Sequence, residues 1–231
     1  MNNQMLQKLI DQFSNKGLID FLSDKNPAFK PNRRLMQEYS SEDFSQALDV
    51  GELPLEHAEI LGVYSFMVNK ALSERTGKKA QYDLAKKVLK HALQGAGIFV
   101  FYDAQGNFRF SLVYANYHGT KVDWSTFKRF TYFVSPQLTN KTFLQRVGEC
   151  TFSSLEKIID AFSVEKVTND FFNGFRTILE KTQKEFEEAN KYTACSWLKS
   201  KYEPEDYQEQ VKSFNLTFLG RIIFLYFLLR K

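Results

Sequence analysis

Carboxylates are concentrated just ahead of an apolar run at residues 60–68. Glu52, Glu56 and Glu59 are the candidate catalytic residues, because carboxylate oxygens are the ligands that Mg²⁺ accepts in proteins. Metal-dependent hydrolysis of a phosphodiester needs only carboxylates to hold the ion and a lysine to orient the attacking water. The full pattern for this chemistry is acids ahead of a strand, followed by an acid and a lysine alternating along that strand.

The strand itself lacks the second half of this pattern. Ser65 and Met67 are two residues apart and therefore share one face of a strand, where the acid and the lysine are required. Lys70 is one pleat out of register with them. The sequence thus predicts either a degenerate catalytic motif or ordinary exposed acids ahead of a core strand, and the metal ligands stay unassigned.

Positive charge gathers in the middle of the chain. Residues 69–146 hold 13 Lys/Arg and 4 Asp/Glu, whereas the whole chain has a net charge of only +4. Within this block a polar and basic segment, residues 72–82, leads into a predicted helix whose N-terminal N–H groups favour phosphate. Arg75, Lys78 and Lys79 are the first candidate DNA contacts, because clustered cations release counterions from a phosphate backbone. The alternative is a solvated basic face without a partner.

Further cations of the same block extend the candidate DNA-binding surface. They are Lys70, Lys86, Arg109, Lys128 and Arg129. The sequences Phe108-Arg109-Phe110 and Lys128-Arg129-Phe130 interleave aromatic rings with cations, which suits stacking on nucleic acid. Phenylalanines at alternate strand positions are equally typical of a core.

Several catalytic classes are excluded by their missing motifs. The chain has no P-loop, no GxSxG elbow, no HExxH and no paired CxxC. Its histidines are widely spaced, at His57, His91 and His118. A structural zinc site and a Cys/His nucleophile are therefore not expected.

Cysteine usage and hydropathy indicate a cytoplasmic protein. Cys150 and Cys195 lie far apart without a pairing pattern, so we expect no disulfide. The most apolar segment, Leu216 to Leu229, contains Gly220 and Arg221 and is shorter than the ~20 residues that span a bilayer. We predict a buried helix there and no membrane contact.

The elements that would position these residues follow a mixed order. Alternating apolar patterns predict strands at 60–68, 98–102, 108–114 and 130–134, with a basic helix at about 78–91 after the first strand. Residues 38–59 are acid-rich sequence that leads into the first strand. This order predicts an α/β domain over residues 1–137 with a mixed sheet between helices. From residue 138 to 231 only helical patterns follow, which predicts an all-helical second region.

Several ordered blocks resemble one protein family. They are LSERTGKKAQYDLAKKVLK, GIFVFYDAQGNFRFSLVYANY, FKRFTYFVSPQLTNKTFLQRVG, FSSLEKIIDAFSVEKVTNDFF and RIIFLYFLLRK. Together they are similar to the N-terminal region of type IIG restriction-modification enzymes, bacterial proteins that fuse a nuclease and an adenine methyltransferase. The resemblance covers about residues 45–231.

The resemblance implies a restriction-endonuclease-like core of the PD-(D/E)xK type, followed by a helical connector. By the order of blocks, the acid-x-lysine strand falls on residues 63–69, where Ser65 and Met67 occupy the expected acid and lysine positions. The implied function is duplex DNA binding in a restriction-modification system, with Mg²⁺-dependent endonuclease activity if the motif works. The chain has no NPPY motif and no glycine-rich cofactor loop, so no S-adenosylmethionine site is expected in it. The alternative function is a scaffold that docks a methyltransferase or specificity partner.

Overall fold

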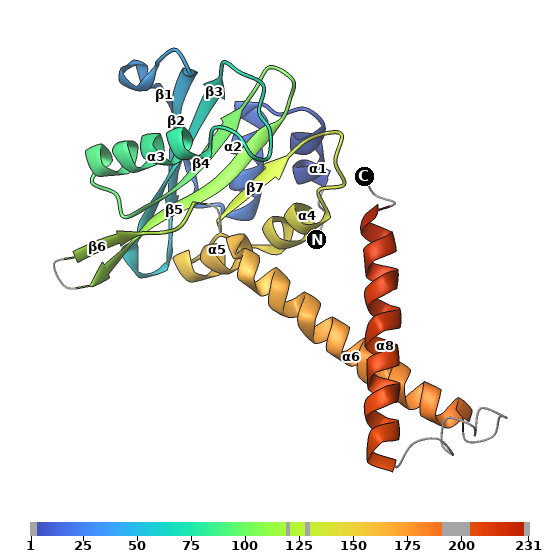
Figure 1. Cartoon of the computed structure of the whole chain (residues 1–231). Helices are drawn as coiled ribbons and strands as arrows, with labels where there is room; N and C mark the ends of the chain where they lie inside the picture. The colour runs from blue at the N-terminus through green and yellow to red at the C-terminus, as the bar shows by residue number, and fades with distance from the viewer. Residues whose placement is uncertain (1–3, 119–120, 128–129, 191–203, 229–231) are drawn as a thin grey trace. The chain divides into compact units, whose positions relative to one another are not determined.

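The computed structural model describes residues 4–118, 121–127, 130–190 and 204–228 (Figure 1). The chain divides into two compact units, Met1–Val164 and Glu165–Lys231. The first unit is built on a mixed seven-stranded sheet flanked by helices, and the second is helical. The predicted α/β class with a helical C-terminal part is therefore confirmed at this level.

The sheet has the order β1-β2-β3-β4-β5-β6, and β7 pairs with β5. The strands are β1 (Lys30–Leu35), β2 (Phe44–Pro54), β3 (Ile60–Val68), β4 (Ala96–Tyr102), β5 (Phe108–His118), β6 (Lys121–Trp124) and β7 (Thr131–Val134). Each pair is antiparallel except β3 and β4, which are parallel. A parallel pair needs a crossover connection, and helix α3 (Lys78–Ala92) supplies it.

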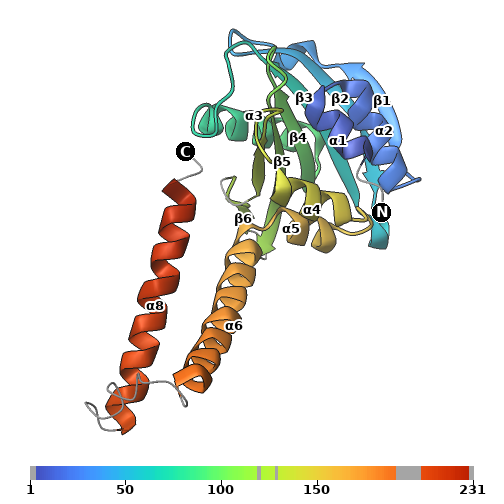
Figure 2. The ribbon, with the colours of Figure 1, turned by 90° about the vertical axis from the view of Figure 1, so that its right-hand side faces the viewer.

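Helices cover both faces of this sheet. On one face lies α3, and on the other lie α1 (Gln4–Asp11), α2 (Asn15–Lys25), α4 (Lys141–Glu149) and α5 (Leu155–Phe162) (Figure 2). Strand β4 shows why a strand between two layers is apolar throughout. Ile98 and Val100 belong to the core under α1, α2, α4 and α5, whereas Phe99 and Phe101 belong to the core under α3.

The β4–β5 hairpin is confirmed, and one carboxylate fixes its turn. Asp103 Oδ1 accepts hydrogen bonds from the backbone N–H groups of Gln105 and Asn107, each at 2.9 Å. Gly106 takes a φ of 84°, which favours glycine. The second oxygen of Asp103 accepts from the N–H of Leu72 at 2.8 Å, so the turn also anchors the segment that leads to α3.

Three strands, β1, β2 and β6, lie where the sequence pattern predicts none. The pattern predicts no element at residues 30–35, where β1 lies, and describes residues 38–59, which contain β2, only as acid-rich sequence. All six residues of β1 are exposed, and the register between β1 and β2 shifts between Pro31 and Arg34. Because backbone pairing rather than an apolar pattern holds β1 in the sheet, its side chains carry little strand signal.

Helices α4 and α5 belong to the first unit, although the sequence analysis assigns residues 138–231 to a helical connector. Phe143 and Val147 of α4 and Ile158 and Phe162 of α5 are buried in the sheet's core. The compact units divide after Val164, later than the predicted boundary. An amphipathic pattern shows that a helix has a buried face, but it does not show what buries that face.

The second unit contains α6 (Val164–Asn190) and α8 (Pro204–Leu228), which pack through the rings of Phe186 and Phe214, 5.4 Å apart. Large apolar side chains are exposed on both helices. They are Phe171, Phe172, Ile178, Phe214, Leu216, Phe218, Ile222, Phe224 and Leu225. Among the described residues, no helix is long and apolar enough to cross a membrane.

Gly51 is required where β1 and β2 approach. Its φ is +151°, and a Cβ there would lie 2.3 Å from the carbonyl oxygen of Lys30. We expect Gly51→Ala to lower the free energy of unfolding by about 3 kcal/mol, because neither the backbone strain nor the clash with main chain can relax. Urea denaturation measures this. Gly95→Ala is the control, since its Cβ would make an ordinary 3.5 Å contact with Tyr117, and equal decreases for both variants would contradict the assignment.

Candidate nucleic-acid interface

Three predicted DNA contacts, Arg75, Lys78 and Lys79, lie at the N-terminus of α3, and we call this region the basic surface. Gly77, in the left-handed conformation with a φ of 74°, is the N-cap and has no side chain to accept from the first turn. The first N–H groups of any α-helix lack partners within the helix, and the helix dipole favours an anion beside them. Arg75 and Lys79 are exposed here, and Lys78 is half-buried. Their types and positions suit a phosphate group.

A buried guanidinium holds the 73–77 loop, which leads into α3. Arg109 on β5 is fully buried, and its Nη2 donates to the carbonyl oxygen of Ser73 at 2.6 Å. Its Nη1 donates to the carbonyl oxygen of Thr76 at 3.1 Å and to Oε1 of Gln81 in α3. One side chain thus joins β5, the loop and the first turns of the helix.

This burial corrects one predicted DNA contact. Arg109 cannot reach DNA, because the sheet and the 73–77 loop enclose its guanidinium. Phe108 and Phe110 are also fully buried and belong to the core, so they offer no stacking surface. Burial lowers the pKa of Arg109 to about 10, with Glu74 opposing the shift, so the group stays protonated at neutral pH. The sequence held a signal for this role, since a single cation inside an apolar strand usually has a structural partner.

Two buried N–H donors of this network lack an acceptor among the described residues. Within the described part of the chain, Nε of Arg109 and Nε2 of Gln81 have no hydrogen-bond partner. Nε2 of Gln81 lies next to Gly77, 3.2 Å from the position that a Cβ would take there. A buried donor without an acceptor is costly, so this environment favours negative charge nearby.

The Arg109 network gives a stability prediction. We expect Arg109→Leu to lower the free energy of unfolding by about 3 kcal/mol, because it leaves the buried side chain of Gln81 and two partly buried loop carbonyl groups without donors. Urea denaturation measures the decrease, and amide exchange should become faster for residues 72–77. Arg75→Leu is the matched control on the exposed side of the same loop and should change stability by less than about 0.5 kcal/mol. Equal effects of the two variants would show that Arg109 does not hold the loop.

Two other predicted contacts, Lys70 and Lys86, form ion pairs with neighbouring carboxylates. Nζ of Lys70 is 2.9 Å from Oδ1 of Asp43. Nζ of Lys86 is 3.1 Å from Oδ1 of Asp83 and 4.3 Å from the centre of the Tyr82 ring. Exposed ion pairs are weak, so phosphate can compete for both lysines. The last two predicted DNA contacts, Lys128 and Arg129, lie outside the described residues. Cys195, the second cysteine of the chain, also lies outside them.

The strand that would carry catalysis has no catalytic geometry. Ser65 is fully buried on β3, and its hydroxyl donates to Oδ1 of Asn15 in α2 at 2.7 Å. Met67 is half-buried on the same strand. A neutral hydroxyl that is already hydrogen-bonded and a thioether replace the acid and the lysine. No local pattern predicts the contact with Asn15, because it joins residues far apart in the sequence.

The three candidate glutamates do not form one site. Glu52 and Glu59 line a pocket of about 630 Å³ at the end of the sheet, whereas Glu56 does not line it. Oε1 of Glu56 is 3.5 Å from Nζ of Lys157, and a hydrogen bond with Ser153 together with the charge of Lys157 lowers the pKa of Glu56. Asp49, the other acid of this region, is buried and accepts from Asn32 at 2.8 Å.

These residues do not fit Mg²⁺. Across the described ranges, no group of three or more histidines, cysteines, aspartates or glutamates is placed to hold a metal ion. The oxygen ligands that the ion needs are dispersed over the pocket, the Lys157 pair and the β1–β2 contact. No catalytic step through a metal is therefore assigned.

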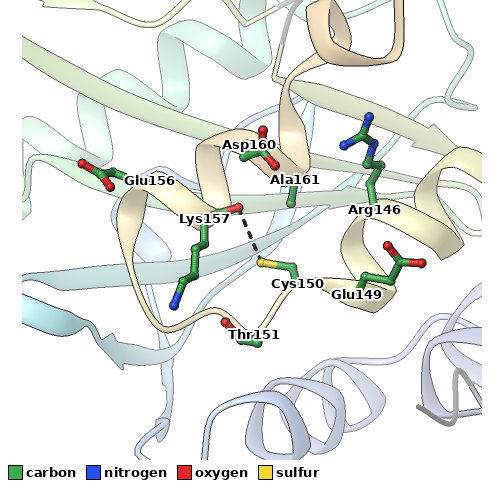
Figure 3. Close-up of a pocket in the computed structure, with 8 residues that line it drawn as sticks. All are labelled: Arg146, Glu149, Cys150, Thr151, Glu156, Lys157, Asp160 and Ala161. Atoms are coloured by element: carbon green, nitrogen blue, oxygen red, sulfur yellow. Dashed lines mark hydrogen bonds between the residues drawn. The ribbon is translucent and has the colours of Figure 1, made fainter. Parts of the chain in front are cut away.

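A second pocket, of about 450 Å³, lies between α4 and α5 (Figure 3). Its lining includes basic and acidic side chains, those of Arg146, Glu149, Glu156, Lys157 and Asp160. Cys150 also lines it, with its thiol donating to the carbonyl oxygen of Lys157 at 3.8 Å. The described lining contains no histidine that could activate the thiol, so the arrangement does not have the form of a nucleophile beside a base.

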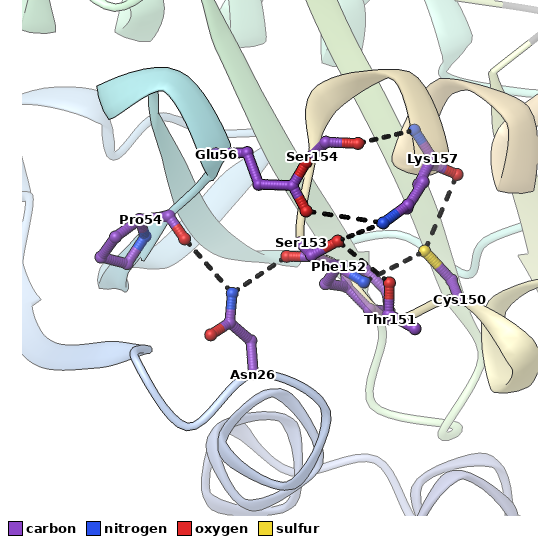
Figure 4. Close-up of polar contacts among 9 residues, drawn as sticks. All are labelled: Asn26, Pro54, Glu56, Cys150, Thr151, Phe152, Ser153, Ser154 and Lys157. Carbon is purple, nitrogen blue, oxygen red and sulfur yellow. Dashed lines mark hydrogen bonds and ion pairs between the residues drawn. The ribbon is translucent and has the colours of Figure 1, made fainter.

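The segment around Cys150 is held by a polar network that joins distant parts of the first unit (Figure 4). Nδ2 of Asn26 donates to the carbonyl oxygens of Pro54 at 3.2 Å and of Phe152 at 3.0 Å. The backbone N–H of Phe152 donates to Sγ of Cys150 at 3.4 Å. The network is structural, because its members satisfy one another.

Cys150 should behave as an inert thiol. Burial raises its pKa, so the thiolate that reacts with alkylating agents is scarce in the folded protein. A raised folded-state pKa also means that the thiol's contribution to stability is complete below about pH 8.5 and declines as the pH rises further. Iodoacetamide labelling followed by peptide mass spectrometry should show slow modification of Cys150 at pH 8 and rapid modification in urea. Equal rates in both conditions would contradict its burial.

Comparison of the chain with protein-family models, curated proteins and solved structures finds no match. The resemblance to type IIG restriction-modification enzymes therefore stays a prediction.

Proposed function

We propose that this chain is a DNA-binding, restriction-endonuclease-like domain of a bacterial restriction-modification system that does not itself cleave DNA. The observation that carries the proposal is that Arg109 holds the 73–77 loop at the N-terminus of α3, the region that carries Arg75, Lys78 and Lys79. A fixed loop with cations and helix N–H groups binds phosphate without first having to be ordered. Such a role would be carried out in the cytoplasm.

The fold supports the nuclease-like class of this proposal. The resemblance implies a mixed sheet between helices, and the first unit has such a sheet, with β3 and β4 parallel and α3 between them. The same order of elements puts the expected acid-x-lysine strand at β3, which carries Ser65 and Met67 instead. Loss of cleavage with retention of phosphate contacts is the function that accounts for both features.

DNA binding of this kind depends on phosphates rather than bases. Affinity for a short fluorescein-labelled duplex, measured by anisotropy, should fall steeply as KCl is raised, with a log-log slope near −0.9 for each phosphate contact. The triple variant Arg75→Ala, Lys78→Ala, Lys79→Ala should weaken binding to unrelated duplexes equally and flatten the slope by about 0.9 for each phosphate that is no longer neutralised. Phosphate contacts carry no sequence information, which is why the weakening is uniform.

The matched control removes three exposed lysines that belong to α1, α2 and β1 rather than to the loop or to α3, namely Lys8, Lys16 and Lys30. It lowers the net charge equally and should keep most of the slope. Equal weakening in both triple variants would reduce the binding to a general charge effect. Incubation of the wild-type protein with duplex DNA and Mg²⁺ or Mn²⁺ should leave the DNA intact, and protein-dependent cleavage that purification does not remove would overturn the non-cleaving assignment.

A second function is favoured by the helical unit. Exposed phenylalanines and aliphatic side chains on α6 and α8 suit a scaffold that docks a methyltransferase domain, a methyltransferase subunit or a specificity partner. This function requires no DNA contact. It becomes the better account if the wild-type chain shows no salt-dependent affinity for duplex DNA.

A further inference from the structure

The pocket that contains Glu52 and Glu59 has a composition unlike the basic surface. It lies in the first unit, where β2 turns through the short 3-10 helix η2 (Glu56–Ala58) into β3, and the C-terminal end of α3 forms part of its wall. Further walls come from the start of β4, the end of β5 and the first residue of α5. Its volume of about 630 Å³ is within the usual range for a binding pocket.

Three large apolar side chains stand exposed around this pocket. Leu93 is 93% exposed, Tyr117 is 65% exposed and Ile60 is 51% exposed. Leu93 is also the C-cap of α3 and has a φ of 53°, a conformation that favours glycine or asparagine at helix ends. A leucine at this position gains almost no burial in the folded chain and carries backbone strain. These are the features of a side chain that is buried by a partner.

The charge of the pocket indicates that its partner is cationic. Among the described residues that line it, the two charged side chains are Glu52 and Glu59, and both are acidic. The C-terminal end of α3 adds a negative helix dipole. Lys90 and His91 belong to the last turn of α3 but do not line the pocket. A phosphate backbone is repelled by such a site, whereas a cation on an aliphatic stem matches both its charge and its apolar walls.

We propose that this pocket docks a basic segment of a partner protein, in which a lysine or arginine stands beside an aliphatic or aromatic side chain. The cation lies between Glu52 and Glu59, where the Tyr117 ring adds a cation–π contact. The neighbouring apolar side chain packs on Leu93 and Ile60. The proposal does not depend on DNA binding, because the pocket lies at the opposite end of the 15-residue helix α3, about 22 Å from the loop at its N-terminus.

Selection from a display library of random peptides on the immobilised full chain tests the proposal. Enriched peptides should carry lysine or arginine adjacent to leucine, isoleucine, phenylalanine or tryptophan. An enriched peptide, labelled with fluorescein, should bind at least about tenfold more weakly to the double variant Glu52→Lys, Glu59→Lys. The control double variant Glu149→Lys, Glu156→Lys changes the charge by the same amount at the pocket between α4 and α5. It should bind the peptide with wild-type affinity.

The variant Leu93→Gly tests the pocket without destabilising the fold. Glycine is favoured at this left-handed position, so the variant should have an unchanged or higher melting temperature while it binds the peptide several-fold more weakly. Its affinity for duplex DNA should be unchanged, which separates this site from the basic surface. No enrichment of any peptide, enrichment of acidic peptides, or wild-type binding by the Glu52 and Glu59 double variant would each overturn the proposal.

Discussion

The position of the 73–77 loop and of the start of α3 depends on one interaction, the hydrogen bonding of the buried Arg109 guanidinium. A charge inside a core is tolerated only when hydrogen bonds replace its lost hydration, and here the acceptors come from Ser73, Thr76 and Gln81. The loop and the first turns of α3 are therefore tied to β5 by a geometry that few alternative side chains can satisfy. Arg75 of the loop and Lys78 and Lys79 of α3 are therefore held in position by a buried cation.

Helix α3 gives the two ends of the unit opposite electrostatic character. It is the crossover that the parallel pair β3 and β4 requires, so its direction follows from the sheet topology. Its N-terminus carries the loop cations, and its C-terminus faces a pocket with two carboxylates and exposed apolar side chains. Sheet topology thus separates the region that we propose to bind phosphate from the pocket that we propose to bind a basic peptide, at the two ends of one helix.

On strand β3, a position for which the sequence predicts a catalytic acid is part of the buried core. Ser65 is the expected position of a metal-binding acid, yet its hydroxyl joins the sheet to α2 through Asn15. A carboxylate at a fully buried site without a cation would carry a large desolvation cost, so the neutral pair is the more stable arrangement. The carboxylates nearby have other partners or face the pocket at the end of the sheet.

Much of this structure follows from local sequence. The central strands, the β4–β5 hairpin and the basic helix are recognisable because periodicity and turn chemistry are properties of neighbouring residues. The same local information identifies the cations of the loop and the missing acid and lysine on β3. It misses β1, whose exposed residues are held by backbone pairing, and the attachment of α4 and α5 to the sheet.

The sequence by itself determined the element types, the charge asymmetry and the residues available for chemistry. Only the tertiary structure decided that Arg109 is a buried support rather than a DNA contact, that Glu56 is separated from Glu52 and Glu59, and that Leu93 stands beside an acidic pocket. The physical reason is that each of these facts depends on contacts between residues far apart in the chain. Burial and partner choice arise when the sheet and its helices close around a side chain, and no local pattern specifies which distant groups will meet it.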